Sequence, residues 1–129
     1  MLKSCQYCGR IHDSKFDCGK KQKRNYIRTK EDQFRYTRAW NNKREEIKQR
    51  DKYLCQVCIR NLYNTLQQFN YDGLEVHHAE KLNDAYEKRM DNDNLLTLCV
   101  YHHRMADRGE IPIGDIKDII QEQEQGYQV

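Results

Sequence analysis

Two stretches in the second half of the chain carry the strongest structural pattern: Leu74-Glu-Val-His-His-Ala-Glu-Lys-Leu82 and Asp91-Asn-Asp-Asn-Leu-Leu-Thr-Leu-Cys-Val-Tyr-His-His103. The first alternates apolar and polar residues over 74–78 and predicts a short strand. The second predicts a returning strand over 95–98. A helix is expected over 100–108, because Gly109 follows it and Pro112 comes shortly after. Together the two stretches predict a hairpin that leads into a helix.

One long helix is expected before this unit. Thr29 has the character of an N-cap, since Glu31 and Asp32 follow it in the first helical turn. No Pro or Gly interrupts residues 30–52, so we expect a continuous helix there. Trp40, the single tryptophan, is expected to anchor this helix in the core rather than to stack on a base.

Shorter elements are expected on either side of the first strand and at the end of the chain. Residues 61–69 predict a short helix with Leu62, Leu66 and Phe69 inward, and 70–73 (Asn-Tyr-Asp-Gly) predict a turn. A last helix is expected over 114–124. Its buried residues would be Ile116, Ile119 and Ile120.

The composition describes a small and hydrophilic chain. Its 129 residues suit a single domain, with 37% hydrophobic and 33% charged residues and a mean hydropathy of −1.13. No apolar run approaches the roughly 18 residues of a membrane span, and basic residues interrupt the start, where a signal peptide would be apolar. We therefore expect a cytoplasmic protein with no membrane association. Because such a chain buries little apolar surface, bound metal is expected to supply part of its stability.

Charge is divided unevenly along the chain. Residues 1–60 carry 17 Lys and Arg against 7 Asp and Glu, a net +10, and residues 61–129 carry 6 against 13, a net −7. The basic half predicts a polyanionic partner, with the densest run of cations over 20–30; a solvated linker is the alternative. We divide the chain into a zinc knuckle (1–19), a basic linker with the long helix (20–52), and a core with the C-terminal helix (53–129).

Cysteine and histidine spacing predicts two zinc sites. Without an export signal, six cysteines favour thiolates over disulfides. Each predicted site has four ligands and so leaves no open position, which is typical of structural zinc. For the first set the alternative is a reduced tail without metal, and for the second it is two buried structural cysteines and a surface histidine. The first predicted set is Cys5, Cys8, His12 and Cys18, and the second is Cys55, Cys58, Cys99 and His102.

Three histidines remain after these two sets are assigned: His77, His78 and His103. An adjacent pair at the end of a strand, together with a histidine on the following helix, predicts a third and open metal site. Such a site can hold a divalent ion with its waters and a phosphate oxygen, and it is typical of hydrolysis. A single histidine on its own is more often structural.

These residues resemble the HNH motif of the ββα-metal, or His-Me finger, endonucleases. The resemblance covers about residues 53–108 and rests on the histidine pair, Asn94 and His103, framed by the cysteine pairs. The framing is similar to the zinc-bearing branch of that family, and the knuckle and basic linker are similar to those of phage-encoded members. It implies a small α+β, zinc-stabilised fold, a ββα-metal core with an N-terminal zinc knuckle and flanking helices.

The resemblance also implies a role for each residue. His78 would be the general base, a role that suits a neutral imidazole with a pKa near 6.5. His77 and His103 would bind the catalytic Mg²⁺, Mn²⁺ or other divalent ion, and Asn94, counted with His78 in the catalytic set, would tie the connecting loop to the hairpin. The implied reaction is hydrolysis of DNA to 5′-phosphate and 3′-hydroxyl ends. A phage terminase is the implied partner, in genome packaging.

One departure from the family pattern affects the assignment. The family typically has Cys-x2-Cys-His at the last site, whereas this chain has Cys99-x2-His102-His103. We assign His102 to zinc and His103 to the catalytic ion, because neighbours on a helix lie about 100° apart. His77 and His78, as neighbours on a strand, point to opposite faces and reach one metal only if the strand twists or ends there.

Two further alternatives stay open at this point. Arg104 is a candidate phosphate contact, and the alternative is an arginine on the helix surface. The rival to a DNA nuclease is a non-catalytic, zinc-stapled DNA-binding protein, and a third interpretation is a nuclease that acts on RNA or as a toxin. The spare histidines favour the nuclease, because a binding module needs only the eight zinc ligands.

Overall fold

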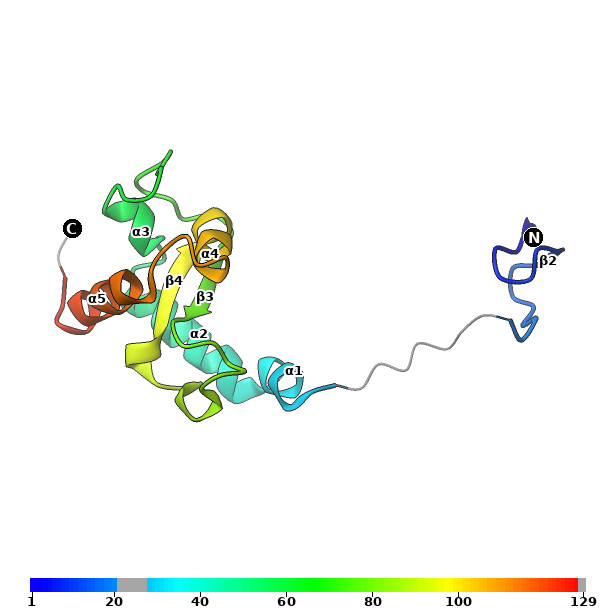
Figure 1. Cartoon of the computed structure of the whole chain (residues 1–129), viewed down its shortest axis with the longest axis horizontal. Coiled ribbons are helices and arrows are strands. Elements are labelled where there is room, and N and C mark those ends of the chain that lie inside the picture. Colours follow the sequence, from blue (N-terminus) through cyan, green and yellow to red (C-terminus); the bar gives the residue numbers. More distant parts are fainter. Residues whose placement is uncertain (21–27, 128–129) are drawn as a thin grey trace.

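The computed structural model describes residues 1–20 and 28–127 (Figure 1). An antiparallel hairpin of β1 (Leu2–Ser4) and β2 (Ile11–Asp13) forms the N-terminal knuckle. A second antiparallel hairpin, β3 (Leu74–His78) and β4 (Leu95–Cys99), forms the centre of the core. The helices that surround it in the described residues are α1 (Lys30–Arg35), α2 (Arg38–Arg50), α3 (Gln56–Ile59), α4 (Val100–Asp107), α5 (Ile113–Glu124), and the 3₁₀ turns η1 (Tyr86–Lys88) and η2 (Asn92–Asn94).

The small α+β fold class predicted from the sequence is confirmed, and the hairpin lies where it was expected. β4 extends one residue further than predicted, to Cys99. The helix that follows ends at Asp107, and Gly109 adopts a left-handed φ of +77°, which suits a residue just beyond a helix end. The last helix and its buried isoleucines are also confirmed. Among the described residues, no helix combines the length and the apolarity that crossing a membrane requires.

The expected single helix over 30–52 is wrong, because the chain breaks it at Tyr36 and Thr37. Thr29 caps α1 as predicted, accepting a hydrogen bond from the backbone N–H of Asp32 at 3.2 Å. Thr37 then caps α2: its hydroxyl accepts from the N–H of Trp40 at 3.2 Å and donates to the carbonyl of Phe34 at 2.8 Å. A threonine hydroxyl competes with the helical hydrogen bonds of the backbone, and here that competition ends one helix and begins another.

The expected helix over 61–69 is also wrong. A short helix lies just before this stretch: α3 begins directly after Cys55 and ends at Ile59, with Arg60 as its C-cap. Asn61, Tyr63 and Asn64 have φ angles of 51–59°, which no right-handed helix accommodates. The residues expected to face inward instead lie at the surface, and Leu66 is 99% exposed. The turn over 70–73 is present, with Gly73 at a φ of +59°.

The β3–β4 hairpin lies between two hydrophobic clusters, one on each face. The cluster on the α2 face joins α1 and α2 to the hairpin through Phe34, Trp40, Ile47, Val76, Leu82 and Leu95. The cluster on the α4 face joins α3, α4 and α5 through buried residues that include Val57, Leu96, Leu98, Met105, Ile116 and Ile120. Alternation along β4 separates the two sets, since Leu95 lies on one face and Leu96 and Leu98 lie on the other. The hairpin is therefore covered on both faces, as Figure 1 shows.

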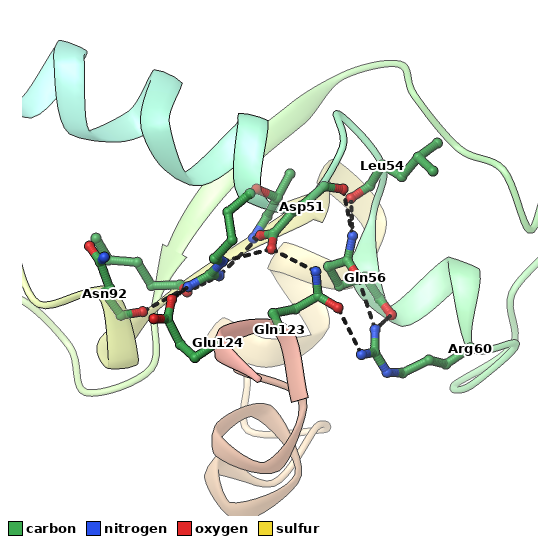
Figure 2. A network of polar contacts seen from close by, with 10 residues as sticks. Asp51, Leu54, Gln56, Arg60, Asn92, Gln123 and Glu124 are labelled. Carbon is green, nitrogen blue, oxygen red and sulfur yellow. Dashed lines mark hydrogen bonds and ion pairs between the residues drawn. The ribbon is translucent and has the colours of Figure 1, made fainter. Parts of the chain in front are cut away.

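A buried carboxylate, Asp51, covers the outer edge of β4 (Figure 2). It accepts hydrogen bonds from Arg50 Nε at 2.9 Å, from the N–H of Thr97 at 2.9 Å and from Gln123 Nε2 at 3.1 Å. Arg50 also donates to the carbonyl of Leu95 at 2.7 Å. The outward-facing N–H of Thr97 and C=O of Leu95 on this edge strand are thus hydrogen-bonded by side chains instead of by water.

The same network holds α5 in place. Arg50 Nη1 donates to Glu124 at 2.7 Å, and Arg60 donates to Gln123 at 3.0 Å and to Glu122 at 2.9 Å. Burial alone would lower the pKa of Arg50, but its hydrogen bonds to Asp51 and Glu124 carry that pKa above its ordinary value. The last helix is therefore attached to α2 and α3 by charged hydrogen bonds as well as by its isoleucines.

Replacing Asp51 with alanine is expected to lower the free energy of unfolding by about 3 kcal/mol, because Arg50 Nε and the N–H of Thr97 then lose their acceptor in a buried position. Denaturant unfolding of the metal-loaded protein measures this change. Asp118→Ala, which removes an exposed carboxylate from α5, should change stability by less than about 0.5 kcal/mol. Equal losses in the two variants would show that the network contributes nothing specific.

Candidate active site

The N-terminal knuckle, residues 1–19, brings its four predicted ligands together. One ligand atom from each of Cys5, Cys8, His12 and Cys18 lies within 4.8 Å of the others. The turn that joins β1 to β2 positions the first two, and Gly9 supports it with a φ of +74°. Backbone N–H groups of Cys8 and Tyr7 lower the pKa of Cys5 to about 6, so its thiolate forms readily.

The imidazole of His12 has one ring nitrogen available as a fourth ligand of this cluster. Its Nδ1 lies 2.8 Å from the carbonyl of Asp13, and a carbonyl can only accept, so Nδ1 carries the hydrogen. Its Nε2 is buried and has no hydrogen-bond partner. A buried ring nitrogen with a free lone pair beside three sulfur atoms fits a metal ion.

The second predicted set lies in the core, where Cys55, Cys58, Cys99 and His102 are all buried. Nδ1 of His102 lies 3.6, 3.3 and 3.4 Å from the sulfur atoms of Cys55, Cys58 and Cys99. The sulfurs of Cys58 and Cys99 are 3.9 Å apart. A tetrahedron with the usual Zn–S and Zn–N bond lengths has edges of about 3.8 Å between sulfurs and about 3.5 Å between sulfur and nitrogen. The spacing therefore fits one zinc ion.

Hydrogen bonding and burial support the same assignment. Nε2 of His102 lies 2.9 Å from the carbonyl of Tyr63, so it carries the hydrogen and Nδ1 faces the sulfurs with its lone pair. Burial raises the pKa of Cys55 and of Cys58, which means that their thiolates need a cation nearby. Cys55 and Cys58 come from the N-cap and the body of α3, Cys99 from the end of β4 and His102 from the first turn of α4, so a metal here would join these three elements.

A third cluster lies at the end of β3 and consists of His77, His103 and Asp107. Asp107 Oδ1 is 3.6 Å from His77 Nδ1, and its Oδ2 is 3.6 Å from His103 Nε2. The two imidazole rings are 5.0 Å apart. On its other side, Nδ1 of His103 contacts the carboxylate of Glu75. Two imidazoles and a carboxylate around one point suit a divalent cation, and the Glu75 contact would fix the orientation of one ligand.

Burial keeps one of these ligands neutral. His77 is 5% exposed, and burial, with the electrostatic effect of the neighbouring His103, lowers its pKa to about 4. At neutral pH its ring is therefore uncharged and offers a lone pair to a metal.

His78 points to the other face of the hairpin. Its ring stacks on Trp40 with 4.8 Å between the ring centroids and packs edge-on against Phe34. Its Nε2 lies 3.1 Å from the carbonyl of Arg89. That carbonyl can only accept, so in the neutral ring Nε2 carries the hydrogen and Nδ1 keeps its lone pair. Burial lowers the pKa of His78, which favours the neutral ring.

Although the two neighbouring histidines face opposite sides, both line one cleft of about 510 Å³. This is possible because β3 ends at His78, at the rim of the hairpin. The cleft also includes His103, Asp107 and Glu75 on the α4 side. On the α1–α2 side it is lined by Arg35 from α1 and by Trp40, Arg44 and Lys48 from α2.

Asn94 is buried and holds the loop between β3 and β4. Its side-chain oxygen accepts from the N–H of Glu80 at 2.7 Å, and its side-chain amide donates to the carbonyls of Glu80 and Lys88, both at 3.2 Å. It does not line the cleft. Its place in the structure is that of a positioning residue.

Arg104 is exposed on α4 and is not among the residues that line the cleft. The basic side chains that do line it come from α1, α2 and the loop after β3. Sequence analysis also missed Asp107 and Glu75, although both carry a usable signal. Asp107 follows His103 by four residues on a helix, and Glu75 precedes His77 by two on a strand, so each pair shares a face.

Comparisons with known proteins agree with this geometry. No protein-family model and no curated protein matches the chain. A solved structure, the HNH endonuclease of the deep-sea thermophilic bacteriophage GVE2 with a manganese ion, is similar to it with a TM-score of 0.51 and 28% sequence identity. The similarity covers 60% of this chain and 78% of that one.

The fold and the cleft therefore define a small α+β protein that is similar in structure to a phage HNH endonuclease and has cysteine and histidine clusters that could bind metal. The chain resembles the HNH endonucleases in structure as well as in motif, and this likeness supports a nuclease.

Elemental analysis of the purified protein is expected to find two zinc ions per chain, one for each four-ligand cluster. Cys58→Ser should lose one and lower the unfolding temperature strongly, because its cluster is buried in the core. Cys8→Ser should also lose one but leave the unfolding of the core nearly unchanged. Wild-type protein without zinc, or a Cys58→Ser variant as stable as wild type, would contradict the assignment.

Proposed function

We propose that the chain is a divalent-metal-dependent DNA endonuclease that leaves 5′-phosphate and 3′-hydroxyl ends. The observation that carries the proposal is that the two histidines at the end of β3 have separate partners but line the same cleft. His77 meets His103 and Asp107 on one face, and His78 is held separately on the other face, yet both line one cleft. This separates a metal-binding group from a proton acceptor while keeping both within reach of one phosphate.

His78 is the proposed general base. Nδ1 takes a proton from the attacking water, a task for which a neutral imidazole is suited near neutral pH. The carbonyl of Arg89 holds the ring in the required tautomer and stabilises the positive charge that forms when the ring is protonated. The stack on Trp40 keeps the ring from rotating away from the cleft.

His77, His103 and Asp107 are the proposed ligands of the catalytic ion. When bound, a divalent cation there supplies charge stabilisation for the phosphate in the transition state and for the leaving 3′-oxygen. His77 binds as a neutral ring because of its burial, and Glu75 orients His103 from behind. Asp107 adds the negative charge that favours an ion such as Mg²⁺ or Mn²⁺ over a softer metal.

The proposed setting follows from the resemblance to phage-encoded HNH proteins. The solved relative comes from a bacteriophage and carries manganese, which supports a phage enzyme and a Mn²⁺-compatible site. We extend the proposal to a role beside the terminase in genome packaging. A packaging assay with and without the His78→Ala chain would test that role.

Replacing His78 with alanine is expected to lower the rate of supercoiled-plasmid cleavage by about 10²–10⁴-fold, because the attacking water loses its proton acceptor. The assay uses Mg²⁺ or Mn²⁺ and compares proteins of equal zinc content. Asn83→Ala, a change at another residue lining the cleft, should keep its activity within a few-fold of wild type.

Three outcomes are informative. Cleavage by wild type and not by His78→Ala, with DNA binding kept in both, supports the enzyme and the base. A His78→Ala variant that cuts as fast as wild type removes His78 from that role. Binding without cleavage in both proteins, with every divalent ion tried, favours a zinc-stapled DNA-binding protein.

Asp107→Asn is expected to raise the Mn²⁺ concentration needed for half-maximal cleavage by at least about tenfold, because the metal loses a charged ligand. Titration of Mn²⁺ into metal-depleted cleavage reactions, at constant zinc content, measures the shift. Asp118→Asn makes the same chemical change at an exposed site on α5 and should leave the titration unchanged. An unshifted Asp107→Asn titration would exclude the carboxylate as a ligand.

A further inference from the structure

The wall of the cleft that faces the His77, His103 and Asp107 cluster is cationic and comes from α2. Arg44 and Lys48 both line the cleft, and each follows the cleft-lining Trp40 at intervals of four residues. Residues four apart lie on one face of a helix, one turn or about 6 Å along its axis. Trp40 stacks on His78, so the two cations continue from the proposed base along a single stripe of the helix.

The other charges of α2 are engaged with one exception, Arg38, which lies at the start of the helix and outside the cleft lining. Lys43 pairs with Glu46, and Arg50 pairs with Asp51 and Glu124. The remaining carboxylate, Glu45, accepts a hydrogen bond from Tyr53. Within the described part of the chain, neither Arg44 nor Lys48 forms an ion pair or a side-chain hydrogen bond.

The acidic side chains of the cleft lie on the opposite wall. Glu75 and Asp107 belong to the cluster around His103, and no acidic residue lines the cleft from α2. Arg35, the third cation on the α1–α2 side, is partly neutralised by Asp32 at 3.1 Å. The cleft thus has one wall suited to a cation and one wall suited to an anion, with the proposed base between them.

We propose that Arg44 and Lys48 bind the backbone phosphates of a DNA strand next to the phosphodiester that the cleft would cut. This assigns phosphate contacts to the folded core, where they are at a fixed distance from the chemistry, in addition to any that the basic linker makes. The inference rests on the proposed function only in naming the neighbouring bond as the one that is cut. Phosphate contacts position a strand without reading its sequence, so the two residues hold the substrate in register with His78.

The test measures binding separately from cleavage. In the His78→Ala background, a short fluorescein-labelled DNA duplex is titrated with protein by anisotropy between about 50 and 200 mM salt. Arg44→Ala/Lys48→Ala should weaken binding by about tenfold or more at the lower salt and reduce the slope of log Kd against log salt by about 1.8, or 0.9 for each lost contact. In the otherwise wild-type chain the same pair should raise KM for cleavage and leave kcat within a few-fold.

Arg38→Ala/Lys52→Ala is the matched control. It removes one arginine at the start of α2 and one lysine two residues after its end, both exposed and both outside the cleft lining. Its Kd should stay within about twofold of the parent, with little change in slope. Equal zinc content and equal unfolding temperature in all variants exclude a folding defect.

The outcomes distinguish this inference from the proposed function. If wild type cleaves DNA and Arg44→Ala/Lys48→Ala binds it unchanged, the proposed phosphate contacts are wrong and the nuclease proposal is unaffected. If the double variant binds more weakly and with a smaller salt slope, but wild type does not cleave, the phosphate contacts are supported and the nuclease proposal is wrong. An equal loss of DNA affinity in the control pair, or no measurable DNA binding by the parent, also contradicts the proposed phosphate contacts.

Discussion

Three cysteine sulfurs and one imidazole nitrogen meet where β4 passes into α4, and the arrangement of the cleft depends on this junction. Cys99 takes part twice, since its sulfur lies beside His102 Nδ1 and also accepts a hydrogen bond from the N–H of His102 as the cap of α4. The first turn of α4 is thereby fixed against the hairpin. His103 is the next residue, and helical geometry turns it away from the sulfurs toward β3.

The end of β3 supplies the second constraint. Alternation along a strand sends His77 and His78 to opposite faces, and within a continuous sheet that would place them in separate environments. Here the strand ends at His78, the loop that follows is held by Asn94, and both rings reach one opening. Each histidine keeps its own surroundings: His77 faces α4 and a carboxylate, and His78 faces an aromatic ring and a carbonyl. Two chemically identical side chains thus acquire different properties from the cores behind them.

Local patterns predicted the hairpin, the capped start of α1, the last helix and the grouping of cysteines and histidines. These depend on alternation, on caps and on ligand spacing, all of which are visible over a few residues. The two wrong helix predictions also rested on local patterns, but on patterns that fit more than one structure. Thr37 could be read either as a helix interior or as a cap, and the hydrogen bond to Trp40 decided it. Leu62, Leu66 and Phe69 had helical spacing, but the left-handed backbone at Asn61, Tyr63 and Asn64 excludes a helix. Asp51 could not be identified at all, because its partners Thr97 and Gln123 lie 46 and 72 residues away.

The two cysteine clusters differ in a way that affects their reactivity. Backbone N–H groups lower the pKa of Cys5 in the half-exposed knuckle, whereas burial raises the pKa of Cys55 and Cys58 in the core. The thiolate is the form that reacts with alkylating reagents and peroxides, and it must also be reachable. Although the pKa of Cys8 is raised, all three knuckle cysteines are more accessible than the buried core set. Oxidants would therefore reach the knuckle first, at Cys5 above all, and a mildly oxidised chain would keep its cleft while losing the ordered knuckle.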